Sequence, residues 1–505
     1  MPFSEKLQDT LNFREPSRKF FWWSFIFLLF AVFLFHGKAI PFSNELVYLL
    51  RLEPNFLPGD WTFTKAANEH WLFNFIFGLP SRVFSLETAG WLGRIAVWCL
   101  CLIALLKIGK LWRIPFWAVT ISCLLWLALA QSVVGEEWIF GGFEAKTAAY
   151  ACLLFALYGF ARGKRTLPSV LLGLSFSFHP AVGLWAVLAI GAALLFEKIP
   201  TADFAKIVAI TAFFSLPALV AIFTEQTIAN ANLYEDWRYI VLFRAPSNLD
   251  PFQFPKSGIV LLFAMLAFNL FALKKNESFA LRFLLKFQIA LGVFFLLGVI
   301  FRWLELYPLL RFMPMRLFPV FTLLFFIFTA FYAVPRLASR KNKLIVSLFA
   351  VAVIALMNPF GSGLAQVREM ARSWTTPRDD FQKVAIWISE NTPQDALVIE
   401  PPSRRDVWYF SKRATIVSFY YPTYDRLTAW RERIGELTDH AKVSNGDTAA
   451  GELETAFNQL PEAQIDKLKQ KYGASYLVSR AVYSYPVVFE TETYKVYKLN
   501  TNAEN

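Results

Sequence analysis

Two carboxylates near the start of this chain lie in a turn-rich segment between long apolar runs, where they could take part in proton transfer. Glu45 follows Asn44, and Asp60 follows Pro58 and Gly59. A Pro-Gly pair fixes a tight turn, which can aim the Asp60 carboxylate back towards the apolar runs. Burial would then tune its proton affinity. A solvated loop aspartate or a helix N-cap is the structural alternative for Asp60.

A second acidic segment leads directly into an apolar run. It carries Glu144 and Lys146, which follow a Gly-Gly-Phe sequence at 141–143. Ionisable side chains at the edge of a membrane are costly and tend to face a cavity or a partner, so these two residues are candidates for a functional site. The alternative is a surface glutamate beside a lysine whose long side chain reaches back to the membrane surface.

Four further residues have side chains suited to binding phosphate. His179 precedes Pro180 at the end of an apolar run, where it could donate to a phosphate oxygen or orient a carboxylate. Arg311 and Arg316 stand where topology rules disfavour cations, and a lipid-linked phosphate would explain them through charge-assisted hydrogen bonds. Arg244 is a similar case. The alternatives are an interfacial histidine and arginines that anchor to anionic lipid headgroups.

The composition indicates what must position these residues. The chain has 505 residues, of which 56% are hydrophobic and only 17% are charged, which is too apolar for a soluble protein with an ordinary surface. We therefore expect a mainly α, polytopic membrane bundle with about eleven spans of roughly 20 residues each. The spans are expected near 20–37, 92–109, 114–133, 147–161, 167–179, 181–196, 206–223, 258–273, 287–301, 318–334 and 343–357.

Basic residues gather in the loops after every second expected span, near 107–113, 162–165, 198–206, 274–286 and 336–343. Positive-inside topology accounts for them, with the N-terminus in the cytoplasm and the C-terminal end outside. The net charge of +12 is spread over these loops, so it does not point to nucleic acid. Residues 167–196 could form one tilted helix or two short spans with a turn at His179-Pro180. The proline and the charge pattern of the later loops favour two spans.

Two parts are expected. Residues 1–373 form the membrane module, with a first outside loop at 38–91 that contains interfacial helices. Residues 374–505 form an extracytoplasmic α/β domain. Its expected elements are helices at 380–391, 424–437 and 450–472, strands at 396–400, 414–419 and 475–479, a hairpin at 487–499, and a flexible loop at 444–451.

Several kinds of site are missing from the sequence. It has no Walker-type phosphate loop, no dinucleotide glycine fingerprint, no HExxH and no nucleophile elbow. The four cysteines lie within or beside apolar runs and have no metal-binding spacing. Cofactor-driven chemistry is therefore not expected.

Taken together, these features resemble the GT-C superfamily of integral membrane glycosyltransferases, which use polyprenyl-phosphate sugars. The resemblance covers nearly the whole chain. It rests on the long first loop with Asp60, the second acidic loop with Glu144, the late basic residues Arg311 and Arg316, and the terminal α/β domain entered at 387–399. Mannosyl- and arabinosyltransferase-type bacterial enzymes are the expected relatives, which implies a bacterial inner membrane.

The resemblance implies transfer of a sugar from a polyprenyl-phosphate carrier to an acceptor hydroxyl, with inversion. Asp60 would be the general base, Glu45 or Glu144 would orient the acceptor or replace it, and the arginines, with Lys146 and His179, would bind substrate. The acceptor would be a glycan, a lipid or a protein. No cofactor is required, although Mg²⁺ or Mn²⁺ is possible. A transporter or flippase of lipid-linked saccharides is the alternative function.

Two departures narrow the resemblance. Asp60 stands alone, without the adjacent acidic partner of protein O-mannosyltransferases. The C-terminal domain has Pro-Pro-Ser-Arg-Arg-Asp at 401–406 where oligosaccharyltransferases carry Trp-Trp-Asp-Tyr-Gly, so asparagine-linked transfer is disfavoured.

Overall fold

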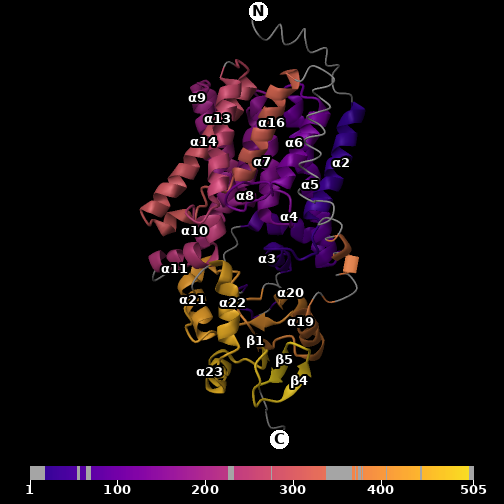
Figure 1. The fold of residues 1–505 in the computed structure, drawn as a ribbon, viewed down its shortest axis with the longest axis vertical. Coiled ribbons are helices and arrows are strands. Elements are labelled where there is room, and N and C mark those ends of the chain that lie inside the picture. Colours follow the sequence, from indigo (N-terminus) through magenta and orange to yellow (C-terminus); the bar gives the residue numbers. More distant parts are fainter. Residues whose placement is uncertain are drawn as a thin grey trace, which may run out of the picture.

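Long helices form one end of an elongated molecule, and a mixed α/β unit forms the other (Figure 1). The structure, a computed structural model, describes residues 18–53, 57, 59–63, 70–225, 233–274, 276–336, 379–404, 407–443 and 446–499, with isolated positions between 365 and 377. The predicted boundary at 373–374 lies outside these described residues.

Ten helices of the bundle coincide with predicted spans. They are α2 (Arg18–His36), α5 (Leu86–Lys110), α6 (Phe116–Ala128), α7 (Ala145–Ala161), α8 (Thr166–Phe178), α9 (Pro180–Phe196), α10 (Thr201–Glu225), α13 (Lys256–Leu273), α14 (Phe279–Trp303) and α16 (Phe318–Arg336). Five of them, α2, α5, α10, α13 and α14, are long and apolar enough to cross a membrane by themselves, and the others are shorter apolar helices. The protein is an integral membrane protein. The eleventh expected span, 343–357, lies outside the described residues, and the number of crossings and their orientation stay predictions.

The two-helix interpretation of 167–196 is confirmed, because α8 ends at Phe178 and α9 begins at Pro180. Proline fits the first position of a helix, where its missing N–H costs nothing. His179 caps α9, since its Nδ1 accepts a hydrogen bond from the backbone N–H of Val182 at 3.3 Å. The turn thereby fixes the orientation of the imidazole.

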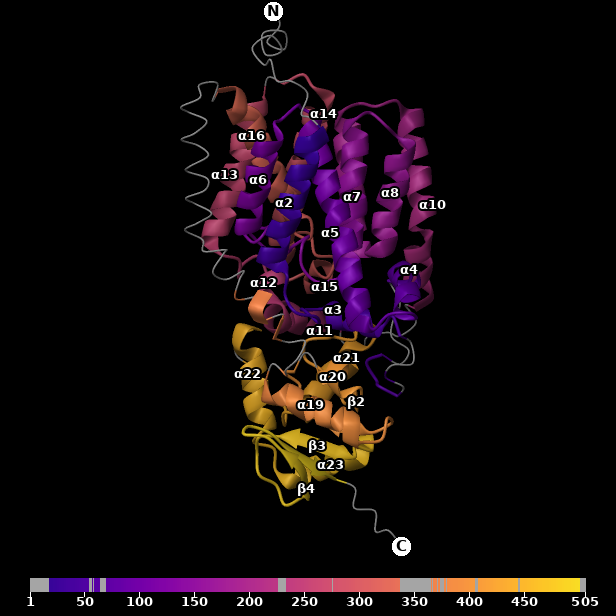
Figure 2. The same ribbon diagram turned by 90° about the vertical axis from the view of Figure 1, so that its right-hand side faces the viewer.

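Short helices gather at the end of the bundle that faces the α/β unit (Figure 2). They are α3 (Glu45–Leu50), α4 (Trp71–Ser81), α11 (Leu233–Tyr239), the π-helical turn η1 (Ile240–Arg244), α12 (Pro246–Leu249) and α15 (Tyr307–Leu310). The first loop therefore contains helices, as predicted. In α4, Phe73 is fully buried whereas Trp71 and Phe75 are exposed, so this helix has one apolar face turned outward.

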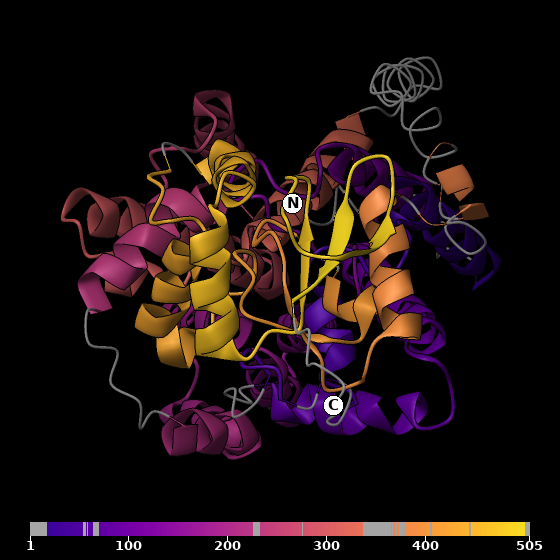
Figure 3. The same cartoon turned by 90° about the horizontal axis from the view of Figure 1, so that it is seen from below.

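The C-terminal unit is built on a five-stranded sheet in the order β2-β1-β3-β5-β4. Strand β1 (Leu397–Ile399) pairs in parallel with β2 (Ala414–Thr415) and β3 (Tyr476–Ser479), and β5 (Lys495–Lys498) pairs antiparallel with β3 and β4 (Val487–Glu490). Helix α19 (Asp380–Asn391) covers one face, and α21 (Leu427–Glu436), α22 (Gly446–Phe457) and α23 (Glu462–Tyr472) cover the other (Figure 3). The remaining elements are α20 (Val407–Ser411) and the 3-10 turn η2 (Tyr424–Arg426).

Three expectations for this unit were wrong in detail. The single helix expected at 450–472 is two helices, because Pro461 has no N–H to continue α22 and instead precedes the first turn of α23. Helix α22 begins already at Gly446, within the loop expected at 444–451. Strand β2 covers only 414–415 of the expected 414–419.

Candidate active site

The Gln131 side chain holds the backbone of the second acidic loop in place through hydrogen bonds. Its side-chain Oε1 accepts hydrogen bonds from the backbone N–H groups of Ile139 and Phe140, both at 2.8 Å, and its Nε2 donates to the Phe140 carbonyl at 2.8 Å. Gly93 of α5 makes room for the Phe143 ring, since a Cβ at this position would lie 2.4 Å from that ring. The loop is thereby held rigidly where it enters α7.

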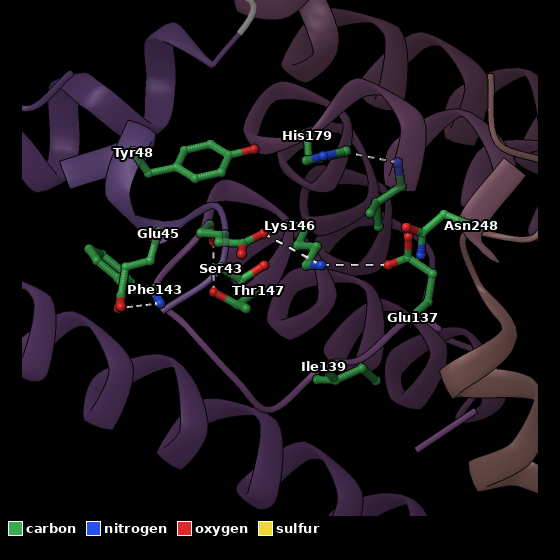
Figure 4. Close-up of polar contacts among 12 residues, drawn as sticks. Ser43, Glu45, Tyr48, Glu137, Ile139, Phe143, Lys146, Thr147, His179 and Asn248 are labelled. Atoms are coloured by element: carbon green, nitrogen blue, oxygen red, sulfur yellow. Dashed lines mark hydrogen bonds and ion pairs between the residues drawn. The ribbon is translucent and has the colours of Figure 1, made fainter. Parts of the chain in front are cut away.

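This loop brings two carboxylates to one ammonium group (Figure 4). The Lys146 Nζ lies 3.6 Å from Glu137 Oε2, 3.4 Å from Glu144 Oε2, and 3.6 Å from the centre of the Trp138 ring. The other oxygen of Glu137 forms an ion pair with the Arg316 guanidinium. Glu137, Glu144 and Lys146 are each at least 94% buried, so four charged groups form one enclosed cluster.

Three polar atoms of the cluster lack a hydrogen-bond partner among the described residues. They are Glu144 Oε1, Glu137 Oε2 and Arg316 Nε, and all three are buried. A buried polar atom without a partner costs about 1–3 kcal/mol or more when charged. Such groups persist at sites where a ligand supplies the missing bond. Because Glu137 Oε2 also lies 3.6 Å from the Lys146 Nζ, the cluster has one acceptor, Glu144 Oε1, and one donor, the Arg316 Nε–H, ready for a polar substrate.

The two carboxylates have different proton affinities. Burial raises the pKa of Glu144 above its ordinary range, and the nearby carboxylates Glu137 and Glu45 add to this effect against the opposing Lys146 cation. Burial acts on Glu137 too, but Arg316 and Lys146 outweigh it and hold the pKa of that carboxyl below its ordinary value. Glu137 thus favours its anionic form, and Glu144 is the carboxylate that accepts a proton more readily.

Two histidines stack beside this cluster, with ring centres 5.0 Å apart. Burial, followed by the charge of Arg316, lowers the pKa of His179 well below its ordinary value, so its imidazole is neutral. Because Nδ1 accepts the Val182 N–H, the proton is on Nε2, which can donate. His70 Nδ1 donates to the Phe178 carbonyl at 3.1 Å, and its Nε2 lies 3.3 Å from the Tyr48 hydroxyl.

The segment that carries Arg316 is anchored to two bundle helices. The Trp185 indole of α9 donates to the Phe312 carbonyl at 2.5 Å, and the Tyr150 hydroxyl of α7 donates to the Arg316 carbonyl. These bonds fix the backbone on both sides of Met313. The guanidinium is therefore presented to the cluster by a rigid support.

Asp60 lies elsewhere, in the contact between the first loop and the C-terminal unit. One oxygen accepts from the Thr62 N–H at 2.8 Å, and the other accepts from the Trp408 indole and the Thr415 N–H, both at 2.9 Å. The structure does not bring Asp60 together with Arg311 or Arg316, as the sequence had led us to expect. Its carboxylate is fully buried and occupied by N–H donors, which suits a clamp between two parts of the chain.

Asp60 makes the stability of this contact depend on pH. Burial raises the pKa of Asp60 from 3.8 to about 6 in the folded protein. The unfolded chain therefore releases this proton first, and we expect the folded state to lose stability as the pH rises from about 4 to 6. The measurement is the unfolding temperature of wild type and Asp60→Asn in nanodiscs between pH 4 and 7. The wild-type value should fall relative to that of the variant, and a constant difference would contradict the assignment.

Glu45 is one half of a buried ion pair. Its two oxygens accept from the guanidinium of Arg94, with the Nε bond at 2.7 Å, and also from the backbone N–H groups of Phe42 at 2.9 Å and Phe143 at 2.7 Å. Both charged side chains are completely buried. The pair joins α3, α5 and the second acidic loop, so its contacts are structural.

We expect Arg94→Met to destabilise the protein by about 3–5 kcal/mol, because Glu45 would then be a buried charge without a counter-ion. Glu45→Gln in the same chain should recover part of this loss, since no charge is then left unpaired. Denaturant unfolding of both variants in detergent measures the difference. Equal loss in the single and double variants would show that the charge of Glu45 is not the cause.

The two other predicted arginines also lie apart from the cluster. Arg311 is exposed, and its guanidinium lies over the ring of the adjacent Phe312. Arg244 donates to the Tyr420 carbonyl of the C-terminal unit, and its guanidinium lies 5.5 Å from the centre of that tyrosine ring. Of the eight candidate residues, Glu144, Lys146 and Arg316 are thus brought together around Glu137, and His179 lies near enough to interact electrostatically with Arg316 and Lys146.

Sequence reasoning missed Glu137 and Tyr48 as members of the site. Glu137 stands next to Glu136, which is exposed, and nothing local distinguishes the two. The Gly-Glu-Glu-Trp run at 135–138 places acidic residues beside a tryptophan. This was the one feature of the sequence that could have pointed to Glu137 as a site residue. For Tyr48 there was no such signal, because its partner His70 is 22 positions away.

Similarity of this chain to solved structures supports the fold. A family model described as a domain of unknown function, DUF6798, matches residues 379–437. No curated protein matches the chain. Among solved structures, it is similar to the oligosaccharyltransferase of Archaeoglobus fulgidus: the complex with Zn and sulfate shows 14% identity over 90% of this chain and 68% of that chain, with a TM-score of 0.50. The apo form shows 12% identity over 92% and 70%, with a TM-score of 0.51.

What is shared with the archaeal enzyme is the fold. That enzyme is a membrane glycosyltransferase of the GT-C type, so the predicted GT-C-like fold is supported, whereas the mannosyl- or arabinosyltransferase branch stays a prediction. Within the described residues, no group of three or more His, Cys, Asp and Glu side chains is arranged to hold a metal ion.

Proposed function

We propose that this protein is a membrane glycosyltransferase that moves a sugar from a polyprenyl-phosphate carrier to an acceptor hydroxyl outside the cytoplasm. One observation carries the proposal: the buried cluster contains a carboxylate of raised pKa, Glu144, beside the two cations Lys146 and Arg316, and both Glu144 Oε1 and Arg316 Nε lack a hydrogen-bond partner among the described residues. Such a set can remove a proton from one oxygen while it stabilises charge on another. The GT-C-like fold supports the same reaction class.

In this proposal Glu144 is the general base, in place of Asp60. Its Oε1 has no hydrogen-bond partner among the described residues, whereas both oxygens of Asp60 are occupied by N–H donors. Glu144 takes the proton of the acceptor hydroxyl while the acceptor oxygen bonds to the anomeric carbon. The bond from that carbon to the phosphate oxygen breaks, its electron pair stays on the phosphate, and the configuration at carbon inverts.

The leaving phosphate is assigned to the cationic side of the cluster. Arg316 Nε–H has no partner, and the separations of 3.4 and 3.6 Å from Lys146 to its carboxylates are longer than strong hydrogen bonds. The Arg316 Nε–H can therefore donate to a phosphate oxygen while the guanidinium keeps its ion pair with Glu137, and Lys146 can turn to a phosphate oxygen without losing a strong hydrogen bond. The neutral His179 would supply a third donor through Nε2. Glu137 keeps Arg316 and Lys146 in place between substrates.

The test uses purified protein in nanodiscs with synthetic undecaprenyl-phosphate hexoses and pentoses, and with glycans and lipids extracted from a bacterial envelope as acceptors. We expect release of undecaprenyl phosphate, detected by mass spectrometry, together with a product of opposite anomeric configuration. Parallel reactions with EDTA, Mg²⁺ and Mn²⁺ measure metal dependence. Intact carrier that crosses the bilayer of a vesicle without loss of sugar would replace the enzyme proposal by transport.

A further inference from the structure

A polar crevice of about 410 Å³ lies between the first loop and the C-terminal unit. Ser43 contributes one wall, the chain around α20 contributes Ser403, Arg404, Tyr420 and Tyr421, and α22 contributes Glu454. Its volume falls within the range of about 300–1,000 Å³ in which small molecules bind. None of these residues belongs to the cluster around Lys146.

The chemistry of the walls favours a neutral polyhydroxyl ligand. Among the described residues that line the crevice, the one cation, Arg404, and the one anion, Glu454, balance in charge, so this lining offers no excess of cations for a phosphate. Serine and tyrosine hydroxyls both donate and accept hydrogen bonds. Tyrosine rings add apolar faces with a polar tip, and the C–H face of a sugar ring packs well on such a surface.

The walls are held in place before any ligand binds. Glu454 accepts hydrogen bonds from Ser403 at 3.2 Å and from Tyr494 at 2.9 Å, and it pairs with Arg480 at 2.8 Å. Arg404 pairs with Asp379 at 2.9 Å. A preformed site avoids the entropy cost of ordering side chains on binding.

The wall that Tyr420 and Tyr421 form is held in place as well. The Tyr421 hydroxyl donates to the Ser43 carbonyl at 3.1 Å, which ties the first loop to the C-terminal unit across the crevice. Tyr420 is held by the bond from Arg244 to its carbonyl. The predicted substrate-binding residue Arg244 thus supports this wall of the crevice.

The crevice adjoins the cluster around Lys146 through the segment 42–45. A Cβ at Gly142 would lie 3.0 Å from the Phe42 carbonyl and 3.1 Å from Glu45 Cβ, and the Phe143 N–H donates to Glu45 at 2.7 Å. The 42–45 segment, which carries Ser43, therefore lies directly on the residues that precede Glu144. Figure 4 accordingly draws Ser43 among the residues around Lys146.

We propose that this crevice binds a saccharide, and that this saccharide is the acceptor whose hydroxyl reaches Glu144. The first half of the statement stands on the crevice alone, and the second half rests on the proposed function. A glycan acceptor is thereby chosen over a peptide or a lipid hydroxyl.

The direct test is saturation-transfer NMR with the full chain in nanodiscs and a panel of soluble disaccharides, namely cellobiose, maltose, mannobiose and chitobiose. Gly451 of α22 also lines the crevice, and a Cβ at this position meets nothing within 4 Å, so Gly451→Trp can fill the space without a backbone clash. Thr455→Trp is the matched control, because it places the same bulk on an exposed position of α22. Tyr420→Ala and Tyr420→Phe form a second pair, in which only the first loses the ring.

At least one disaccharide should give a signal with wild type, Thr455→Trp and Tyr420→Phe, and the signal should fall at least tenfold with Gly451→Trp and Tyr420→Ala. No signal from any disaccharide, signal from serine- or threonine-containing peptides alone, or full signal from Gly451→Trp would each overturn the proposal. Binding of undecaprenyl phosphate, measured separately by native mass spectrometry, should be the same in all five proteins. If that lipid does not bind while a disaccharide does, the glycosyltransferase proposal fails and the saccharide site stands.

Discussion

Glu144→Gln is expected to lower the rate of sugar transfer by about 10²–10⁴-fold, which is the usual contribution of a general base. The amide has nearly the same shape as the carboxylate but cannot accept the acceptor's proton. Because Glu137 remains to pair with Arg316 and Lys146, the phosphate-binding side of the cluster stays intact. Binding of undecaprenyl phosphate should therefore change little, and the loss should appear in kcat.

Two control variants make this prediction specific. Glu136→Gln removes an exposed carboxylate from the same loop and should leave the rate unchanged. Asp60→Asn is the decisive comparison, because the sequence alone favoured Asp60 as the base. If Glu144 is the base, Asp60→Asn should keep most of the transfer rate after correction for folded protein. The reverse pattern, with Asp60→Asn inactive and Glu144→Gln active, would return the base role to Asp60.

The pH profile of kcat gives an independent check. Burial raises the pKa of Glu144 above the ordinary range of a glutamate, so the acidic limb of the profile should lie above the pH expected for an exposed carboxyl group. Glu144 must be deprotonated to act, and the rate should therefore rise as the pH increases through that limb. Glu144→Gln should remove the limb.

Much of the fold was accessible from the sequence because bilayers impose simple rules. Runs of apolar residues predicted ten of the described helices, and Pro180 after His179 predicted the turn between α8 and α9. The C-terminal unit was harder. Proline at 461 divides a stretch whose periodicity suggested one helix, and β2 spans only two residues, too few for a local pattern to define its end.

The site could be predicted only in part from the sequence, because carboxylates with similar neighbours in the sequence make different contacts in the fold. Glu45, Asp60 and Glu144 all stand near the ends of apolar runs. Their partners decide what each one does, and those partners are Arg94, Trp408 and Lys146, at separations of 49, 348 and two positions. Only the last pair is local in sequence. The contacts of Asp60 depend on where the C-terminal unit packs, which no local pattern in the sequence shows.

Arg316→Lys is expected to weaken binding of undecaprenyl phosphate by about 10- to 100-fold. A charge-assisted hydrogen bond contributes about 1.5–3 kcal/mol, and each 1.4 kcal/mol corresponds to about a factor of ten in affinity. Lysine keeps the positive charge beside Glu137 but lacks the Nε–H that has no partner among the described residues. Native mass spectrometry of the protein in nanodiscs with added undecaprenyl phosphate measures the change.

A second variant separates this effect from the ion pair itself. Arg316→Met alone would leave Glu137 as a buried anion with only Lys146 as counter-ion, which costs stability. Combined with Glu137→Met, it removes both charges together, so the fold should survive while phosphate binding is lost. Arg311→Lys is the matched control, since Arg311 is exposed and should affect binding less than twofold. A phosphate that is held by Arg316 must bind more weakly when the guanidinium is replaced. Unchanged affinity in Arg316→Lys and in the double variant would therefore mean that the phosphate binds elsewhere.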